Sequence, residues 1–385
     1  MKPDVVVVGA GIVGAACAEA CSGRGLRVEV LEQAGVGGGA TAAGMGHLVV
    51  MDDSEAQFAL TRYSRSLWQG LAPELAPEVE YTASGTIWVA ADGDEMAEAE
   101  RKRRYYAAHG VEAELLSAAA LAESEPQLRS GLAGGLLVPQ DAVIYPPCGA
   151  RWLLERARRA GAVVRLGAQV AAMRGGAEGC EVELADGSRL SAGAAVCAAG
   201  ADSVRLFAGL PIRWRKGHLV ITDRYPGWLR HQLVELGYVK SAHAHDGDSV
   251  AFNAQPRATG QILIGSSRQF DDRSPAVDHR MLSRMLRRAG EFMPALAELD
   301  ALRVWTGFRA ATPDGLPLIG PWPGAAGVWL ATGHEGLGIT TALATGALVA
   351  DGLTGARPAI APEPYLPARW IGREEAEEAS DAHHG

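Results

Sequence analysis

Three glycines and one glutamate near the N-terminus have the residue types and spacing that bind a dinucleotide. The glycines lie in the hexapeptide Gly9–Gly14, which has the pattern G-x-G-x-x-G, and Glu32 follows 23 positions after Gly9. The first glycine permits a tight turn, the second lets backbone N–H groups reach a pyrophosphate, and the third lets a helix lie close to a strand. A carboxylate at Glu32 accepts hydrogen bonds from a ribose diol and disfavours a 2′-phosphate. These residues predict a binding site for FAD or NAD.

The elements around this hexapeptide are those of a βαβ unit. The β-branched run Asp4–Val8 predicts a buried parallel strand, a helix-forming stretch follows to about Arg24, and Arg27–Leu31 predicts a second strand. A pyrophosphate would then lie at the N-terminus of the helix, where the helix dipole favours an anion. The apolar stretch between Asp4 and Glu19 is too short for a membrane span, and the βαβ unit explains this stretch better than an export signal does.

Two further glycine-rich segments suggest close approach of the backbone to a ligand. The segment Gly35–His47 follows the ribose-binding acid directly, as expected for backbone that lies along an extended cofactor. Near the C-terminus, a predicted strand at Gly327–Ala331 leads through a glycine-rich turn to a helix predicted from Thr340 to about Leu353. The N-terminal amides of that helix can face the electron-rich edge of a ring. The sequence contains no second G-x-G-x-x-G, so we expect no separate NAD(P)H domain.

Five segments together resemble the D-amino-acid oxidase family, which includes glycine oxidase, sarcosine oxidase and D-amino-acid dehydrogenase. They keep the family's order and spacing over nearly the whole chain. The stretch Gly44–Ser64 and the pair His334-Glu335 look most like the branch of bacterial D-hydroxyproline dehydrogenase. The five segments are Gly9–Gly14, Gly37–Met45, Ala198–Ala201, Thr312–Pro321 and Ala331–Thr340.

The resemblance implies an α/β fold in which a Rossmann-type FAD-binding domain carries an inserted α+β substrate domain with an antiparallel sheet. We expect a discontinuous FAD-binding domain made of residues 1–50, 140–205 and 305–372, and a substrate domain made of residues 51–139 and 206–304. The acidic tail, residues 373–385, is expected to be disordered, and the sequence leaves open whether His383 and His384 are native. Within the substrate domain we expect strands at 213–223, 249–253 and 261–265, helices at 54–76 and 94–109, and one or two helices at 278–299.

The resemblance also implies which residues contact FAD. The cofactor is expected to bind non-covalently because no cysteine or histidine lies in an obvious attachment motif, although His47 keeps covalent attachment open. Val170, at the end of a predicted strand, is expected to contact the adenine through its backbone, with an ordinary core valine as the alternative. The residues expected to contact FAD are Gly9, Gly11, Ile12, Val13, Gly14, Glu32, Gln33, Gly38, Gly39, Ala43, Gly44, Met45, Val170, Gly200, Gly307, His334, Glu335, Gly336, Leu337, Gly338, Ile339 and Thr340.

A flavin that oxidises an amino acid takes a hydride from Cα, so the protein must hold that C–H bond over the flavin N5 atom. Arg309 matches the carboxylate-binding arginine of the family, and a planar guanidinium suits bidentate binding of a carboxylate. The alternative is an ion pair with Asp314 or another acid. The family's second carboxylate contact, a tyrosine, falls near Phe252-Asn253, so Asn253 can supply one hydrogen bond. Glycine oxidase has arginine where Gly336 stands, which predicts a roomier, less cationic pocket.

Three polar residues beside the cofactor loops are further candidates for substrate contact. His47, His334 and Glu335 can each touch an amine, a ring hydroxyl or the flavin edge, or can simply be loop residues with satisfied hydrogen bonds. The favoured reaction is oxidation of a D- or N-substituted amino acid to its imine without a catalytic acid or base, and the favoured substrate is 4-hydroxy-D-proline or D-proline. The alternatives are a glycine or sarcosine oxidase, a broad D-amino-acid dehydrogenase, and an FAD-binding subunit of a larger complex.

Composition argues against other classes of protein. The 385-residue chain has a formal charge of −9, whereas binding a phosphate backbone needs a basic face. The run Arg101–Arg104 is expected to be a solvated face, with membrane or partner docking as the alternative. Five cysteines without C-x-x-C spacing fit a reducing compartment, so we expect a cytoplasmic protein, and peripheral binding at the inner membrane remains an alternative.

Motifs for other chemistries are weak. The cluster of His243, His245, Asp246 and Asp248 lies in a loop-like stretch without a further spaced ligand, so we expect no metal site. No G-x-S-x-G occurs, which leaves a hydrolase unsupported. The sequence leaves open the oligomeric state and whether O2, a quinone or an electron-transfer protein reoxidises the flavin.

Overall fold

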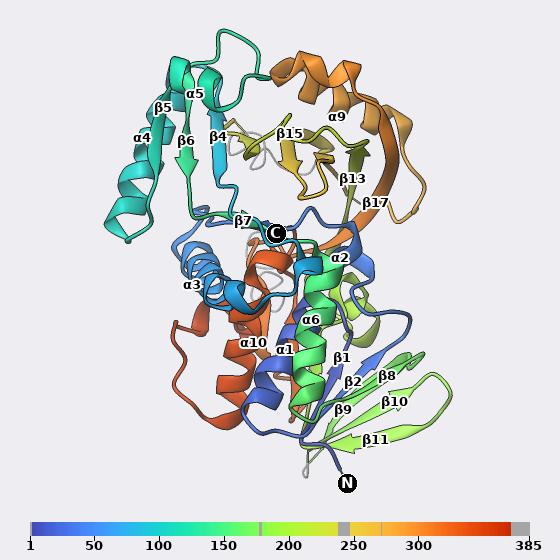
Figure 1. Cartoon of the computed structure of the whole chain (residues 1–385). Helices are drawn as coiled ribbons and strands as arrows, with labels where there is room; N and C mark the ends of the chain where they lie inside the picture. Colours follow the sequence, from blue (N-terminus) through green and yellow to red (C-terminus); the bar gives the residue numbers. More distant parts are fainter. Residues whose placement is uncertain (1, 177–178, 238–246, 271, 371–385) are drawn as a thin grey trace, which may run out of the picture. The chain divides into compact units, whose positions relative to one another are not determined.

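The computed structural model describes residues 2–176, 179–237, 247–270 and 272–370 (Figure 1). The chain forms two compact units. The fingerprint unit contains Met1–Thr41, Pro147–Arg213 and Ala310–Gly385, and the insertion unit contains Ala42–Pro146 and Trp214–Arg309. The predicted disordered tail, His383 and His384, and three members of the weak His/Asp cluster lie outside the described residues.

A six-stranded sheet forms the centre of the fingerprint unit. Every pair of neighbours in it is parallel except the last two strands at one edge, which are antiparallel. The strand that precedes the fingerprint lies inside the sheet, and its four valines are buried, as its β-branched sequence predicts. The order is β18 (Leu318–Pro321), β19 (Val328–Thr332), β12 (Ala194–Cys197), β1 (Val5–Val8), β2 (Val28–Glu32) and β8 (Val163–Leu166).

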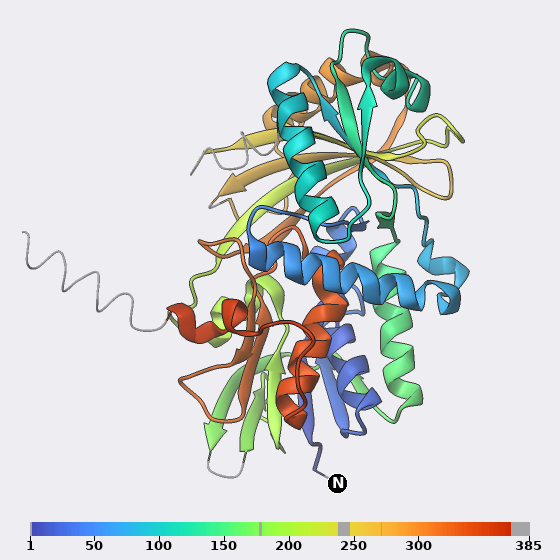
Figure 2. The same cartoon turned by 90° about the vertical axis from the view of Figure 1, so that its left-hand side faces the viewer.

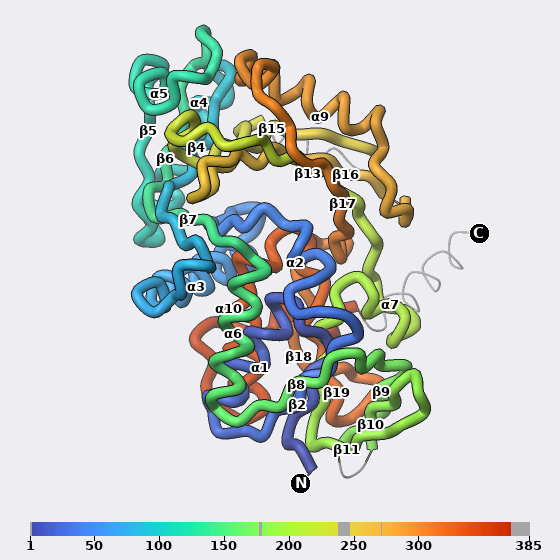
Figure 3. Tube along the Cα trace, turned by 45° about the vertical axis from the view of Figure 1, so that its right-hand side comes forward, coloured from blue at the N-terminus to red at the C-terminus, as the bar shows by residue number. Residues whose placement is uncertain are grey.

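Two helices of small residues pack side by side in the fingerprint unit (Figure 3). They are α1 (Ile12–Gly23) and α10 (Gly338–Thr354). A Cβ atom at Gly346 of α10 would lie 2.5 Å from the carbonyl oxygen of Ala16 in α1, so only glycine permits this approach. The N-termini of both helices can therefore belong to one binding surface.

A three-stranded sheet and one further helix complete most of this unit. The predicted hairpin is confirmed as β10 (Gly179–Leu184) and β11 (Arg189–Ala192), and the predicted helix after two prolines is α6 (Pro146–Arg159). Val170, which the sequence places at the end of a strand, is the first residue of β9 (Val170–Gly176). The preceding strand, β8, ends at Leu166, and Gly167 with a φ of +70° starts the turn between the two.

An eight-stranded sheet forms the centre of the insertion unit. Its strands from the predicted 213–223, 249–253 and 261–265 regions pair antiparallel, as expected. One pair, β14 with β4, is parallel, because these strands come from the two separate segments of the unit and not from a hairpin. The order is β17 (Ala301–Ala311), β13 (Arg213–Thr222), β16 (Ile262–Phe270), β15 (Ser249–Pro256), β14 (Gln232–Glu235), β4 (Thr86–Ala90), β6 (Gly134–Val138) and β5 (Glu114–Ser117).

Two helices of the insertion unit, α3 and α9, end shortly before a proline. The helix predicted at 54–76 is shorter, because α3 (Glu55–Leu71) gives way to 3-10 turns that begin near Pro73 and Pro77. The stretch 278–299, predicted as one or two helices, forms α9 (His279–Phe292) and a separate 3-10 turn that begins at Pro294. The helix α4 (Gly93–Ala108, cyan in Figure 2) contacts β4, β5 and β6, and α9 contacts β15 and β16. The short helix α5 (Ala118–Ser124) also belongs to this unit, whereas the short helix α7 (Ser203–Leu206) belongs to the fingerprint unit.

The basic run Arg101–Arg104 on α4 is only partly a solvated face. The side chain of Lys102 is 1% exposed, forms an ion pair with Asp52 and lies 4.9 Å from the centre of the Trp88 ring. The three flanking arginines also form ion pairs, because Arg101 pairs with Asp52 and Glu98 while the next two arginines share the carboxylate of Glu100. The prediction of a wholly solvated run was therefore wrong at Lys102.

Two negative observations hold for the described part of the chain. No helix there is long and apolar enough to cross a membrane. No group of three or more histidine, cysteine, aspartate or glutamate side chains in that part could hold a metal ion.

Candidate active site

The fingerprint turn between β1 and α1 requires glycine at two positions. Gly9 has a φ of +103°, and a Cβ atom there would lie 2.7 Å from the carbonyl oxygen of Ala198. A Cβ atom at Gly14 would lie 2.0 Å from the carbonyl oxygen of Gly9, so only glycine lets α1 start this close to the turn. The tight turn and the close helix predicted for the first and third glycines are the geometry observed.

The N-terminus of α1 has the features of an anion-binding site. Gly11 is the N-cap residue and provides no capping side chain, and the first turn carries no acidic residue. The N–H of Ile12 donates to the hydroxyl of Thr41 at 3.0 Å, which ties the glycine-rich loop to the helix start. The positive end of the helix dipole thus faces a position that a pyrophosphate can occupy beside Val13 and Gly14.

Glu32 at the end of β2 is held in place by two backbone amides. One carboxylate oxygen accepts from the N–H of Ala10 at 2.8 Å, and the other accepts from the N–H of Ala34 at 2.8 Å. A carboxylate oxygen can accept more than one hydrogen bond, so both remain able to bind a ribose diol. Two further residues that the sequence assigns to the cofactor are exposed: Gln33 directly follows Glu32, and Gly38 lies in the loop after it. This donor and acceptor set fits the FAD that the sequence predicts.

The glycine-rich segment after Glu32 is not wholly extended. Residues Gly39–Ala43 form the short helix α2, which the sequence did not predict. Elsewhere in the fingerprint unit, the carbonyl oxygen of Gly200 accepts from the hydroxyl of Thr332 at 2.9 Å, at the end of β19. The predicted cofactor residue Gly200 is therefore tied to the strand that leads into the second glycine-rich turn.

That second turn, Thr332–Thr340, places its polar residues differently. His334 is buried, and its Nε2 atom lies 2.9 Å from the hydroxyl of Thr345 on α10. Burial lowers the pKa of His334 to about 3, so the imidazole is neutral at physiological pH. These contacts favour the alternative in which His334 holds the turn.

The rest of the turn forms the start of α10. Glu335 has a φ of +48°, and its N–H donates to the carbonyl oxygen of Ala310 at 2.8 Å, while Gly336 is exposed. Leu337 precedes Gly338, the first residue of α10, and the first turn with Ile339 and Thr340 carries no acidic side chain. The N-terminus of α10 is thus a second position where backbone amides can face an electron-rich group, as the sequence predicts for the edge of a cofactor ring.

In the insertion unit, Arg309 lies on β17 and is fixed by the sheet beside it. Its Nη1 atom donates to the carbonyl oxygen of Ser267 at 3.0 Å. A Cβ atom at Gly217 would lie 2.8 Å from both terminal nitrogens of the guanidinium, so a side chain there would displace the guanidinium where Arg309 crosses β13. Asp314, the partner in the alternative reading of Arg309, is bound by Arg369 at 2.8 Å.

The structure brings His47 and Asn253 together in the insertion unit. His47 lies on β3 (His47–Leu48), which pairs with β7 (Ala142–Val143), and its ring interacts with the side chain of Asn253 on β15. Burial lowers the pKa of His47 to about 4, and the contact with Asn253 opposes part of that shift. His47 is therefore a neutral hydrogen-bonding group beside Asn253.

Three residues predicted to contact the cofactor also meet in this unit. A Cβ atom at Gly307 would lie 2.2 Å from the Cβ atom of Ala43, and one at Gly265 would lie 3.1 Å from the sulfur of Met45. Met45 packs with Leu219 and Leu263, which belong to the same side of the sheet. The loop that contains Gly44 therefore lies against the sheet face that carries Gly307.

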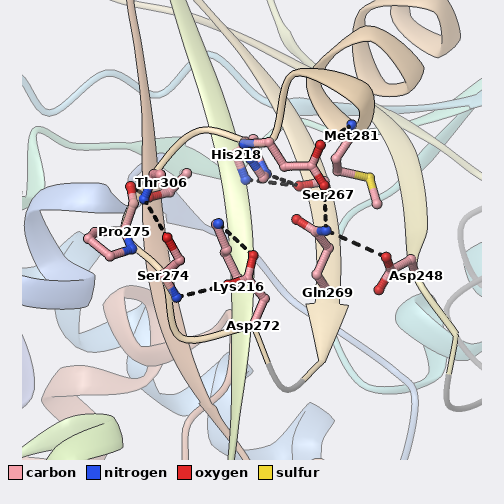
Figure 4. Close-up of polar contacts among 12 residues, drawn as sticks. Lys216, His218, Asp248, Ser267, Gln269, Asp272, Ser274, Pro275, Met281 and Thr306 are labelled. Atoms are coloured by element: carbon pink, nitrogen blue, oxygen red, sulfur yellow. Dashed lines mark hydrogen bonds and ion pairs between the residues drawn. The ribbon is translucent and has the colours of Figure 1, made fainter.

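His218 is a residue near Arg309 that the sequence did not single out (Figure 4). Its backbone N–H donates to the hydroxyl of Ser267 at 2.9 Å, and its Nδ1 atom lies 2.9 Å from the same hydroxyl. Its Nε2 atom accepts from the N–H of Asp278, the N-cap of α9, at 3.0 Å, so the ring proton is on Nδ1. Burial and the charge of Lys216 lower the pKa of His218, which keeps the ring neutral.

This network connects the start of α9 to the arginine. The hydroxyl of Ser267 accepts a hydrogen bond from the ring of His218, and its carbonyl oxygen accepts one from Arg309. Lys216 pairs with Asp272 at 2.7 Å beside it. The residues lie on different strands and on a helix N-cap, so no local motif could have identified them.

The comparisons with known proteins agree with this geometry. Residues 4–352 match the family model described as DAO, FAD dependent oxidoreductase. The chain is 30% identical to the glycine oxidase of Pseudomonas putida over 97% of this chain and all of the relative, and 28% identical to that of Geobacillus kaustophilus over 96% and 98%.

Solved structures are similar over the same length. The crystal structure of the Geobacillus kaustophilus glycine oxidase has a TM-score of 0.86 at 27% identity and covers 96% of this chain and 100% of its own. L-proline dehydrogenase from P. horikoshii shares the fold with a TM-score of 0.86 at 24% identity over 96% of this chain and 98% of its own. With the dinucleotide cradle at Gly9–Gly14 and Glu32 in place, the chain belongs to the DAO family and is an FAD-dependent oxidoreductase.

Proposed function

We propose that this enzyme oxidises the Cα–N bond of a D- or N-substituted amino acid to an imine, and that 4-hydroxy-D-proline or D-proline is the favoured substrate. The observation that carries the proposal is Arg309, whose guanidinium is held by the carbonyl oxygen of Ser267 and lies against Gly217. A guanidinium fixed in this way presents its donors in one plane, which is the geometry that a carboxylate requires. The similarity to proteins named glycine oxidase supports an amino acid as the substrate class.

The residues of the chain bind and orient the substrate. Arg309 holds the carboxylate, which fixes the position of Cα. Asn253 and the neutral ring of His47 lie together and can hydrogen-bond the amine without adding positive charge that would repel it. FAD, when bound by the fingerprint unit, would supply the acceptor for the hydride that leaves Cα, and the proton of the amine nitrogen would pass to solvent water.

The substrate class is tested by anaerobic bleaching of the purified yellow protein. We expect cyclic D-imino acids to bleach the flavin fastest among glycine, sarcosine, D-alanine, D-proline, 4-hydroxy-D-proline and the L-enantiomers of the last two. Faster bleaching by glycine, sarcosine or D-alanine would move the assignment to an oxidase or dehydrogenase for those substrates. If none of these compounds bleached the flavin, the chain would instead be an FAD-binding subunit whose partner catalyses.

His218 is expected to act as a positioning residue for Arg309. In His218→Phe the contact to Ser267 and the acceptor for Asp278 are both lost, so the carbonyl that holds Arg309 is less well placed. We expect a roughly 3- to 10-fold rise in KM for the substrate identified above, with little change in kcat or FAD content, because a carboxylate contact is weakened by about one hydrogen bond.

The matched control is His279→Phe, at the exposed first residue of α9 next to Asp278. It leaves the Ser267 contacts intact and is expected to keep the wild-type KM. Equal KM values in both variants would show that His218 does not position Arg309. A fall in kcat alone would likewise contradict the positioning role, because substrate binding would then be intact.

A further inference from the structure

A buried polar network crosses the insertion unit beside the candidate substrate residues. Arg65 donates to Asp141 at 2.7 Å, and the side chain of Thr86 interacts with the same carboxylate. The Nε2 atom of Gln232 donates to the hydroxyl oxygen of Thr86. Because a carboxylate can only accept, Thr86 gives its proton to Asp141 and uses a lone pair for Gln232.

This chain of donors and acceptors fixes the orientation of the Gln232 amide. Its nitrogen faces Thr86, so its carbonyl oxygen faces away from the network. That oxygen is buried and has no hydrogen-bond partner among the described residues. Gln255 is also 0% exposed, and in the described part of the chain neither its amide oxygen nor its amide nitrogen has a partner. Buried amides without partners are rare, so these three atoms require an explanation.

The two glutamines are neighbours on one face of the sheet. The register that pairs Leu233 with Ala254 puts Gln232 across from Gln255 on the adjacent strand. Leu233 and Ala254 belong to the core cluster that contains residues of α9, so the two glutamines point to the opposite face.

That opposite face carries the candidate substrate residues of this unit. Asn253 lies two residues before Gln255 on β15, which places it on the same face at about 7 Å along the strand. Gln255 is directly opposite Leu263, and Leu263 packs with Met45. The unpaired amides therefore lie one row beyond Asn253 on the face to which the predicted cofactor residue Met45 also belongs.

We propose that Gln255 and Gln232 form a subsite for an uncharged hydroxyl group on the substrate. The hydroxyl donates its proton to the carbonyl oxygen of Gln232 and accepts from the amide nitrogen of Gln255 through one lone pair, so it pairs two of the three unpaired atoms. The nearest charges in the network, Arg65 and Asp141, neutralise each other, so an ammonium or a carboxylate would find no counter-ion there. The subsite rests on the proposed function, and it would select a hydroxylated imino acid over its unsubstituted analogue.

Selection for the hydroxyl is tested with two matched pairs of compounds on the FAD-loaded protein. The reactive pair is 4-hydroxy-D-proline and D-proline, compared by kcat/KM for flavin reduction. The unreactive pair is 4-hydroxytetrahydrofuran-2-carboxylate and tetrahydrofuran-2-carboxylate, which lack the amine and are compared by Kd from calorimetry. We expect the hydroxylated member of each pair to be favoured about tenfold by the wild-type protein, as expected for one to two net hydrogen bonds.

The variant Gln255→Met keeps the size and the unbranched shape of the side chain and removes the amide. We expect it to reduce both tenfold ratios to about one, chiefly through weaker use of the hydroxylated compound. The matched control is Gln57→Met on α3, where a buried glutamine also has an unpaired carbonyl oxygen but lies outside the sheet. This control is expected to keep the wild-type ratios.

Each outcome decides the subsite separately from the proposed function. Three results would overturn the subsite. The first is a wild-type Kd ratio near one, and the second is no measurable binding of either tetrahydrofuran compound. The third is a ratio that Gln255→Met leaves unchanged. Failure of every imino acid to reduce the flavin would overturn the proposed function, and the Kd ratio would still test the subsite. Loss of the ratio in Gln255→Met but not in Gln57→Met would support the subsite.

Discussion

The variant Arg309→Ala is expected to retain FAD and to reduce its flavin with substrate at least about a hundredfold more slowly at low substrate concentration. Removing one partner of a desolvated, hydrogen-bonded charge pair costs roughly 2–5 kcal/mol, and about 3 kcal/mol corresponds to that factor. Arg309→Lys is expected to recover little of the rate, because an ammonium on the same strand cannot reproduce the planar contact with Ser267 and a carboxylate. Anaerobic stopped-flow reduction with the best substrate of the bleaching panel measures kcat/KM for both variants.

The control for this experiment lies on the same strand. Arg303 on β17 is exposed, and its guanidinium lies 5.3 Å from the centre of the Trp305 ring. Arg303→Ala removes an equal charge from β17 and is expected to change kcat/KM less than threefold, since exposed cation–π contacts contribute only about 0.5–1 kcal/mol. Unchanged kinetics in Arg309→Ala would remove this residue from the carboxylate-binding role. Loss of FAD would show a structural role in its place.

The variant Gly14→Ala is expected to be purified without its yellow colour. The added Cβ atom would lie 2.0 Å from the carbonyl oxygen of Gly9, and this neighbour is backbone that cannot move away as a flexible side chain can. Either α1 or the fingerprint turn must shift, which displaces the N–H groups that would bind the pyrophosphate. We expect the Kd for FAD to rise by a factor on the order of 100 or more, because several charge-assisted hydrogen bonds depend on that geometry.

FAD content is measured by the absorbance of the purified protein at flavin wavelengths, and Kd by titrating the apoprotein with FAD. The matched control is Gly23→Ala at the other end of α1, where an added Cβ atom would meet nothing within 4 Å. Alanine favours helix over glycine, so this control is expected to fold and to bind FAD normally. Circular dichroism of Gly14→Ala separates loss of the cofactor from unfolding. Full FAD content in a folded Gly14→Ala would contradict the cradle described for this turn.

The features that the sequence determined by itself are those in which neighbours along the chain set the geometry. The strand, turn and helix around Gly9–Gly14 were predicted because β-branched residues, glycines and helix formers follow one another within about one βαβ unit. Glu32 was predicted for the same reason, since its distance from Gly9 is set by a single helix and a short strand. The helix boundary that failed is the one before Pro73 and Pro77, where a weak helical signal continued past the point at which the helix ends.

The partners of charged and polar side chains, in contrast, depend on which strands and helices become neighbours in the folded chain. Arg309 was identified by its motif, but the contacts to Ser267 and Gly217 exist because β17, β13 and β16 become neighbours in one sheet. The sequence predicted a solvated Lys102, whereas the structure buries it in contact with Asp52 and Trp88. Likewise Gln255 carries no local signal, and its buried amide has meaning only beside Gln232 on the next strand. Strand pairing joins residues that are far apart in the chain, and hydrogen bonds across such pairs leave no spacing that a single sequence can reveal.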